Sequence, residues 1–305
     1  MAGELKEFDM TNHILQLSDN RRLSYALYGP GDGKPVFYFH GTPSSRLELM
    51  MLPSFDVAIE KLLQQYNLKL IAVDRPGFGN SDFNPRGTFA TFAHDLSALA
   101  SALNILNASS LAWSGGGPYA LSQAYHFPGL IKSVYILTGF TTSFNEADVL
   151  KNMASNKYYF RAAKYTPWLL KQVLRTVGKK PSKKHIPQWI SQLPDVDHIP
   201  LSSDPIKTEA FTRYTEVEAV RNGAAGPVHE ARLYFNSSDY KLEDIQQPVH
   251  YWWGTKDNVV IPHHYKAVEA RVPNPHLYIK NGEGHFSIYI KCIEEVLRTI
   301  SKNSF

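Results

Sequence analysis

The chain has 305 residues, 43% of them hydrophobic and 20% charged, and a formal net charge of +4. This length suits one or two domains and can bury a full core without disulfides or metals, and the composition is ordinary for a globular protein. The single cysteine, Cys292, excludes an intrachain disulfide, and the small charge gives no indication of a nucleic-acid partner.

Targeting signals are missing from the sequence. Residues 1–10 include acidic residues and no long apolar run, which is unlike a signal peptide. No run of 18 apolar residues occurs, so we expect neither a transmembrane helix nor membrane insertion, and a cytoplasmic location by default. The one basic cluster contains Lys179, Lys180, Lys183 and Lys184. We interpret it as a solvated loop, with contact to an anionic membrane or another polyanion as the alternative.

The first half of the chain alternates apolar runs with a helical pattern. Short apolar runs bounded by turn residues predict strands at residues 14–18, 23–28, 36–39, 68–73, 110–113 and 131–137. Apolar side chains at spacings of three and four predict a helix through Phe89, Phe92, Leu96, Leu99, Leu103 and Leu106. Another helix is expected from Pro118 onward. This alternation is typical of a parallel sheet with helices on both faces.

The alternation stops near residue 140 and returns after residue 230. The intervening stretch is richer in Lys, Pro and aromatic residues and contains helical fragments without a convincing strand. Beyond it we predict strands at 249–253 and 276–279, a helix at 262–270 and a closing helix. The simplest organisation is an α/β sheet domain formed by residues 1–140 and 231–305, with a helical insertion at 141–230.

A serine lies on the predicted turn between a strand and a helix, within Ala112-Trp113-Ser114-Gly115-Gly116-Gly117-Pro118. Such a turn exposes the serine hydroxyl, and small residues two positions before and after it let the strand and helix approach. The usual G-x-S-x-G pattern is altered, because Ala112 stands at the first glycine position. A glycine-rich turn with an incidental serine is the alternative.

A serine nucleophile needs a base, and the base needs an orienting acid. On such a sheet these residues follow the serine in the order acid, then histidine. Asp257 and His285 supply that order, each just beyond a predicted strand, where α/β sheets place their ligands. Asp244 precedes its strand and would lie at the other end of the sheet. We therefore predict Ser114, His285 and Asp257 as nucleophile, base and orienting acid.

Acyl transfer also needs two N–H groups directed at the oxyanion. One is expected from Gly115, the residue after the nucleophile. The other is expected from Thr42, in the loop His40-Gly41-Thr42-Pro43 that follows a predicted strand. This chemistry requires neither a cofactor nor a metal, and the adjacent His263 and His264 carry no metal-ligand pattern.

Taken together, these segments resemble the α/β-hydrolase superfamily. The resemblance covers nearly the whole chain and includes the segment Asp74-Arg75-Pro76-Gly77-Phe78-Gly79-Asn80-Ser81, similar to a D-x-x-G-x-G-x-S motif. It implies a mostly parallel eight-stranded sheet and a cap, here residues 141–230. Candidate substrate-binding residues are Trp113, Trp168, Phe211 and Tyr214, although cap aromatics also pack the cap's own helices.

The predicted activity is hydrolysis of a small carboxylic ester, with an apolar acyl compound as the small-molecule substrate. Alternatives on the same three residues are an aminopeptidase similar to proline iminopeptidases and a carbon–carbon hydrolase or lyase. A slow, receptor-like ligand-binding protein is a third. A cap carboxylate near the site, from Glu216, Glu218 or Glu230, would favour the aminopeptidase, because it could hold a substrate amine. The sequence does not determine the oligomeric state.

Overall fold

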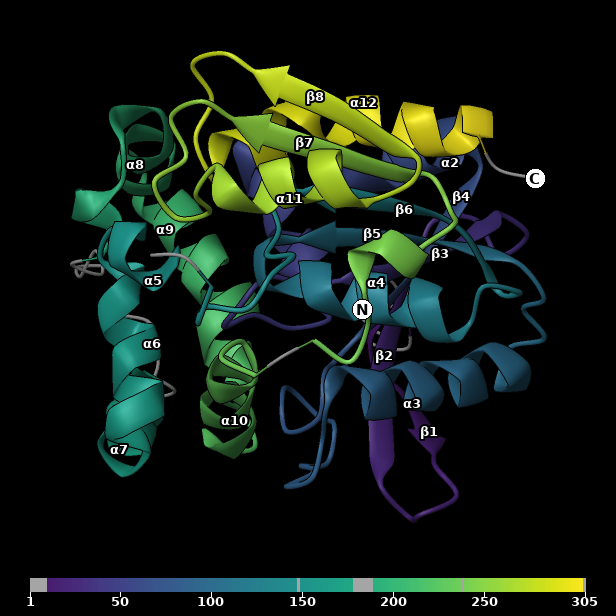
Figure 1. The fold of residues 1–305 in the computed structure, drawn as a ribbon, viewed down its shortest axis with the longest axis horizontal. Helices are drawn as coiled ribbons and strands as arrows, with labels where there is room; N and C mark the ends of the chain where they lie inside the picture. The colour runs from purple at the N-terminus through teal and green to yellow at the C-terminus, as the bar shows by residue number, and fades with distance from the viewer. Residues whose placement is uncertain (1–9, 147–148, 178–188, 237, 304–305) are drawn as a thin grey trace, which may run out of the picture.

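The computed structural model describes residues 10–146, 149–177, 189–236 and 238–303 (Figure 1). The lysine cluster at residues 179–184 lies outside the described residues. Eight strands form one sheet in the order β1-β2-β4-β3-β5-β6-β7-β8. Their bounds are β1 His13–Gln16, β2 Arg22–Tyr28, β3 Lys34–Phe39, β4 Leu68–Val73, β5 Ala108–Trp113, β6 Ile131–Leu137, β7 Val249–Gly254 and β8 Pro275–Lys280.

The sheet is mostly parallel, which confirms the predicted fold class. Strands β3 to β8 pair in parallel, whereas β2 pairs antiparallel with both β1 and β4. Parallel strands buried on both faces are continuous apolar runs. Every residue of β5 and β7 is buried, as this rule requires.

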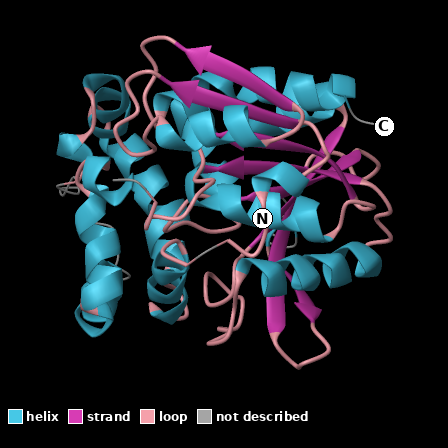
Figure 2. Ribbon diagram, viewed as in Figure 1, coloured by secondary structure: helices cyan, strands magenta, loops and turns pink. Residues whose placement is uncertain are grey.

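Helices cover both faces of the sheet (Figure 2). Figure 1 shows α3 (Phe89–Ala102), α4 (Gly117–His126) and α11 (His263–Arg271) in front of the sheet, with α2 (Ile59–Tyr66) and α12 (Ser287–Asn303) behind it. The short 3-10 helices η1 (Glu48–Phe55) and η2 (Ser114–Gly116) follow β3 and β5. The carboxyl ends of β7 and β8 point toward a separate group of helices at the left of Figure 1.

That group lies between β6 and β7, and its described residues form helices and no strand. We call it the helical segment. Its α-helices are α5 Val149–Asn152, α6 Asn156–Tyr165, α7 Pro167–Val177, α8 Asp195–Ser202, α9 Pro205–Thr212 and α10 Ala225–Leu233. It also contains a 3-10 turn, η3 (Ile190–Gln192), and a π-helical turn, η4 (Arg213–Val217), and another 3-10 turn, η5 (Leu242–Asp244), lies between it and β7. None of the described helices is long and apolar enough to cross a membrane.

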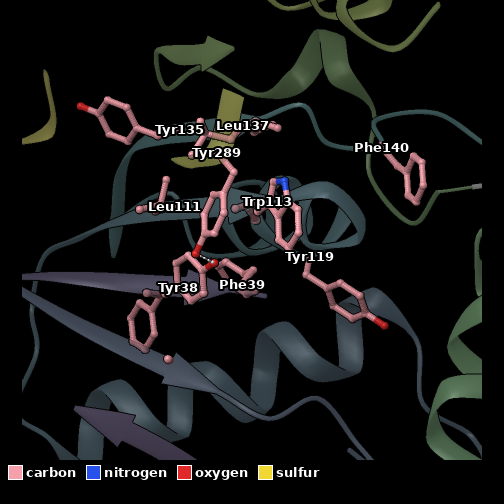
Figure 3. Close-up of a cluster of buried hydrophobic side chains, with 14 of the residues drawn as sticks. Tyr38, Phe39, Leu111, Trp113, Tyr119, Tyr135, Leu137, Phe140 and Tyr289 are labelled. Atoms are coloured by element: carbon pink, nitrogen blue, oxygen red, sulfur yellow. Dashed lines mark hydrogen bonds between the residues drawn. The ribbon is translucent and has the colours of Figure 1, made fainter. Parts of the chain in front are cut away.

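Aromatic residues fill the core beneath the carboxyl ends of the central strands (Figure 3). The Trp113 indole stacks on the Tyr289 ring with 4.5 Å between centroids, and the Tyr289 hydroxyl lies 2.6 Å from that of Tyr38. All three side chains are buried. Burying large rings contributes much of a core's stability, and buried tyrosine hydroxyls require hydrogen-bond partners. These residues fix the end of β5, directly before Ser114.

One boundary differs from its prediction. The helix predicted to include Leu106 ends at Ala102, and Asn104 adopts a left-handed conformation with φ 55°. Asparagine tolerates this conformation and commonly ends helices. Leu106 is therefore 83% exposed, while Leu99, about two helical turns earlier, is fully buried.

This difference gives a matched pair of leucine substitutions. We expect Leu99→Ala to lower the free energy of unfolding by about 2–5 kcal/mol, because it leaves a cavity in the core. Leu106→Ala should change it by less than about 0.5 kcal/mol. Urea denaturation followed by circular dichroism measures both. Equal losses from the two substitutions would mean that the helix continues to Leu106.

Candidate active site

Ser114 lies at the sharp turn between β5 and α4, with the backbone conformation typical of a nucleophile turn between a strand and a helix. Its backbone is left-handed, with φ 52°. A non-glycine residue in this region is strained, and such strain is found at functional sites when the surrounding structure enforces it. Only 5% of Ser114 is exposed. The surrounding structure therefore holds Ser114 in a strained backbone conformation that fixes the direction of its hydroxyl.

Small residues make the turn possible. A Cβ atom added to Gly116 would collide with the carbonyl oxygen of Phe39 on β3, and one added to Gly117 would collide with that of Phe140. Ala112, at the position where a glycine is usual, is fully buried and pairs with Phe39 in the sheet. The methyl group is accommodated, so the altered motif still forms the turn.

The structure brings the three predicted residues together in one hydrogen-bonded chain. The Ser114 Oγ lies 2.9 Å from His285 Nε2, and His285 Nδ1 lies 3.0 Å from Asp257 Oδ2. Ser114 follows β5, Asp257 follows β7 and His285 follows β8, so all three lie at the carboxyl edge of the sheet. Both distances are within the range of ordinary hydrogen bonds.

Asp257 is held in place on both of its oxygens. Its Oδ1 accepts the backbone N–H groups of Val259 at 2.7 Å and Val260 at 2.8 Å, while the Thr138 hydroxyl donates to Oδ2. Charge-assisted hydrogen bonds of this kind are stronger than bonds between neutral groups. The carboxylate can therefore orient the His285 ring without rotating away.

The loop that carries Thr42 lies against the turn that carries Ser114. A Cβ atom added to Gly115 would lie 2.5 Å from the Thr42 methyl group and 2.6 Å from the Tyr234 hydroxyl. Gly115 is the second residue of η2, where backbone N–H groups have no partner within the helix. The two residues predicted as oxyanion donors are thus adjacent.

A buried arginine anchors the Thr42 loop from behind. The Arg75 guanidinium donates to the carbonyl oxygens of His40 at 2.5 Å and Gly41 at 2.7 Å, and it forms an ion pair with Glu230 at 2.8 Å. The Tyr234 hydroxyl donates to Glu230 and also to the carbonyl of Gly115, at 2.9 Å. One polar cluster therefore touches both the Thr42 loop and the Ser114 turn.

A second buried carboxyl, that of Glu48, holds the same loop from the other side. It accepts the Gly41 N–H at 2.9 Å and the Tyr38 hydroxyl. Burial raises the pKa of Glu48 from 4.5 to about 7, although these donors oppose the shift. Near neutral pH this group is divided between its neutral and charged forms.

Asp197, from α8 of the helical segment, caps the loop that carries His285. Its carboxylate accepts the backbone N–H groups of His285 at 2.7 Å, Phe286 at 3.0 Å and Ser287 at 2.7 Å. Burial raises the pKa of Asp197, and these N–H groups oppose the shift. A Cβ atom at Gly284 would collide with this carboxylate, which explains the glycine before His285. Sequence reasoning missed Asp197, because no motif surrounds it and 88 residues separate it from His285.

The four candidate substrate-binding residues are placed differently. Phe211 packs edge-on against Phe286, next to His285, with 5.6 Å between ring centroids. Trp113 is buried beneath the site, and its indole stacks on the His285 ring at 5.5 Å. Tyr214 is partly buried and its ring lies beside Arg213. Trp168 is not brought to this cluster, because its side chain is 68% exposed on α7.

The three carboxylates considered as amine anchors also differ. Glu230 is paired with Arg75, and Glu218 accepts from Arg46 at 2.9 Å and from Arg221 at 2.8 Å. Glu216 instead accepts a hydrogen bond from the Trp189 indole at 3.0 Å, and burial raises its pKa to about 7. Two of the three are therefore already neutralised by arginine.

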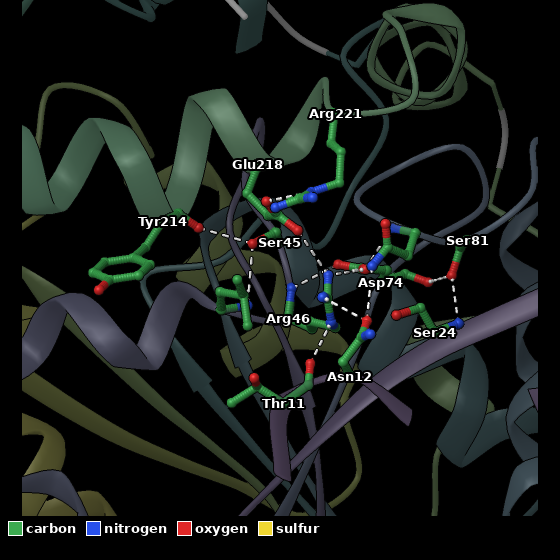
Figure 4. A network of polar contacts seen from close by, with 12 residues as sticks. Thr11, Asn12, Ser24, Ser45, Arg46, Asp74, Ser81, Tyr214, Glu218 and Arg221 are labelled. Atoms are coloured by element: carbon green, nitrogen blue, oxygen red, sulfur yellow. Dashed lines mark hydrogen bonds and ion pairs between the residues drawn. The ribbon is translucent and has the colours of Figure 1, made fainter. Parts of the chain in front are cut away.

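Glu218 belongs to a network that joins the helical segment to the sheet domain (Figure 4). The Arg46 guanidinium lies between Glu218 and Asp74, 2.8 Å from the latter, and its Nε donates to the Thr11 carbonyl. Asp74 also accepts the backbone N–H of Arg46 at 2.8 Å. Nearby, the Ser45 hydroxyl donates to the Tyr214 carbonyl at 2.8 Å. Several contacts thus fix the helical segment over the Thr42 loop.

No group of three or more metal-ligating side chains occurs among the described residues. His264 is buried, its Nδ1 lies 3.2 Å from the backbone N of Thr141, and burial lowers its pKa to about 3. It is a neutral core histidine.

Comparison with known proteins identifies a family. A family model described as alpha/beta hydrolase fold matches residues 34–291. The uncharacterized protein Rv2715 of Mycobacterium tuberculosis is 27% identical over 270 residues, which are 85% of this chain and 72% of the relative. A putative proline iminopeptidase of Mycoplasma genitalium is 29% identical over 125 residues, 40% of this chain and 38% of that protein.

Solved structures share the fold over almost the full length. The esterase RhEst1 from Rhodococcus sp. ECU1013 superposes with a TM-score of 0.69 at 20% identity, covering 96% of this chain and 99% of that one. A structure from a study of carboxylesterases of the thaumarchaeon Nitrososphaera gargenis gives a TM-score of 0.68 at 18% identity, covering 96% and 100%. At these identities the likeness is one of fold.

The buried carboxyl of Glu48 yields a prediction about pH. Because its folded pKa of about 7 exceeds its ordinary 4.5, its contribution to stability is complete below about pH 4.5 and is lost as the pH rises through 7. Glu48→Gln cannot ionise, and its amide can still accept from Gly41 and donate to Tyr38. We expect it to be more stable than the wild type at pH 9, by on the order of 1–3 kcal/mol.

Denaturant melts from pH 4.5 to 9 test this expectation. The stability difference between Glu48→Gln and the wild type should grow across that interval and level off above pH 8. A difference that stays constant with pH would show that Glu48 does not titrate in this range.

Proposed function

The chain belongs to the α/β-hydrolase fold family, and from this premise we propose that it hydrolyses small carboxylic esters through an acyl-enzyme on Ser114. The observation that carries the proposal is the continuous hydrogen-bonded chain from Ser114 Oγ through His285 to Asp257. A serine hydroxyl gains nucleophilicity only when a base lies within such reach and is itself oriented.

The proposed reaction has two halves. The Ser114 Oγ attacks the ester carbonyl while its proton passes to His285 Nε2. The tetrahedral oxyanion accepts hydrogen bonds from the backbone N–H groups of Thr42 and Gly115. The C–O bond to the alcohol then breaks, and His285 returns the proton to the leaving oxygen. Water, deprotonated by the same ring, attacks the acyl-enzyme and releases the acid and free Ser114.

Asp257 supports both halves without exchanging a proton. Its carboxylate accepts a hydrogen bond from the N–H at His285 Nδ1, so that Nε2 faces the serine. Its negative charge stabilises the imidazolium that forms during the reaction. The N–H groups of Val259 and Val260 hold this carboxylate in position.

We assign residues 141–230 the role of a cap over the site. Its aromatic residues Trp189 and Phe211 lie 5.8 Å apart, and Phe211 contacts Phe286 beside the base. Apolar walls of this kind favour a small apolar acyl group. Trp168 is left out of this pocket because of its exposure.

An aminopeptidase is the second candidate, and one observation supports it. Among the three carboxylates considered above, Glu216 is the one that pairs with an indole N–H and not with arginine. A carboxylate in that state could bind a substrate amine. Turnover of prolyl p-nitroanilide, abolished by Glu216→Gln, would establish this activity in place of the esterase.

The main test is labelling by a fluorophosphonate probe together with turnover of p-nitrophenyl acetate through octanoate. We expect the wild type to label and to turn over, and Ser114→Ala to lose both, since losing the nucleophile costs on the order of 10⁶ in turnover. Ser101→Ala, at an exposed serine on α3, is the matched control and should retain full activity. An unlabelled wild type, or an active Ser114→Ala, would refute the proposal.

Asp197 gives a second test, of how the base is positioned. We expect Asp197→Ala to lower kcat at least about tenfold with little change in KM, because the His285 loop loses three N–H acceptor contacts. Asp195→Ala, at an exposed acid in the same first turn of α8, controls for helix stability and should leave kcat unchanged. Equal effects of the two substitutions would mean that Asp197 only stabilises α8.

A further inference from the structure

The outer side of α6 and α7 carries an unusual set of exposed apolar side chains. Each is between 47% and 71% exposed. They are Tyr158, Tyr165, Trp168, Leu169 and Val173, and we call this surface the α6–α7 face. Single exposed apolar residues are normal on a surface, whereas five on one pair of successive helices point to a contact site.

The same helices use their other side for the core. Phe160, Ala163, Leu170 and Leu174 are buried, and both helices pack against α10. Figure 1 shows α6 and α7 following one another along the left edge of the molecule, beside α10. The inward side already provides the apolar contacts that hold the helices. Packing among the residues that the structure describes therefore leaves the apolar side chains of the α6–α7 face exposed.

The charge around this face has one sign. Residues 149–177 contain no Asp or Glu. Their basic residues are Lys151, Lys157, Arg161, Lys164, Lys171 and Arg175. Neither Arg161 nor Lys171 forms an ion pair with another described residue. An exposed apolar surface on helices that carry only cations favours an anionic partner.

From this combination we propose that the α6–α7 face docks peripherally on an anionic lipid bilayer. Helices that lie in a membrane interface combine Lys and Arg with Trp, Tyr and Leu, which bury in the headgroup region. Each cation near an anionic leaflet adds to binding. A second copy fits poorly, because the two faces would repel. A nucleic acid would leave the aliphatic Leu169 and Val173 without a function.

The face is close to the candidate site through the helix that carries it. Tyr158 lies on the outer side of α6, while Phe160 on the inner side packs against Tyr234, with 5.8 Å between centroids. The Tyr234 hydroxyl donates to the Gly115 carbonyl. A docked bilayer would thus be separated from the Ser114 turn by α6 and by Tyr234 at the end of α10.

Vesicle flotation with the full chain tests the proposal. The Ser114→Ala variant is used, so that lipid turnover does not alter the vesicles and failure of the esterase proposal does not affect the result. We expect binding to phosphatidylcholine vesicles with 30% phosphatidylserine, little binding to pure phosphatidylcholine, and loss of binding in 0.5 M NaCl. Arg161→Glu/Lys171→Glu should weaken binding at least about tenfold, and Trp168→Ala should weaken it as well.

The control reverses two charges elsewhere. Lys61→Glu/Lys302→Glu changes exposed lysines on α2 and α12 by the same total charge and should bind like its parent. In the wild-type background, Arg161→Glu/Lys171→Glu should keep its turnover of soluble p-nitrophenyl acetate. Equal loss of binding in both double variants, binding to DNA without binding to vesicles, or dimerisation that Arg161→Glu/Lys171→Glu abolishes would each overturn the proposal.

Discussion

The geometry of the site depends on the contacts of one buried group, the guanidinium of Arg75. It neutralises Glu230 and holds two successive carbonyl groups of the Thr42 loop, those of His40 and Gly41. A charge buried this deeply is tolerated only when every donor finds an acceptor, and removing one partner of such a pair is strongly destabilising. The loop that faces Ser114 is therefore fixed by the same bonds that stabilise the ion pair.

Three buried carboxylates of the helical segment are likewise held by partners in the sheet domain. Asp197, Glu218 and Glu230 reach out of three different helical elements, and each binds a different part of the sheet domain: the His285 loop, Arg46 and Arg75. All three are buried. Because such bonds are directional, they set the orientation of the segment more narrowly than apolar contact alone. These three carboxylates therefore couple the position of the helical segment to that of the site.

The sequence predicts best what is encoded locally. Apolar runs predict β4 and β6 to the residue. Turn chemistry singles out Ser114, Asp257 and His285, each beyond the end of a strand, and the structure brings these three side chains within hydrogen-bond reach. Contacts between distant segments leave no such signal. Asp197 and its three N–H partners are an example, and so is the buried Glu48.

One prediction from periodicity and one from aromatic character differ from the structure. Periodicity continued a helix through Leu106, where the left-handed Asn104 ends it. Aromatic character alone suggested Trp168 as a pocket residue, but composition cannot tell which side of a helix faces inward when both sides carry apolar residues.

The positions of β6 and β7 in the sheet bear on how the helical segment is joined to the sheet domain. These strands pair directly and in parallel, so the chain leaves the sheet at the carboxyl end of β6 and re-enters it on the neighbouring strand, at the amino end of β7. A segment inserted between neighbouring strands can be exchanged for another without changing which strands pair. The shared carboxylates limit that exchange, since any replacement segment must bring its own acceptors for Arg46, Arg75 and the His285 loop.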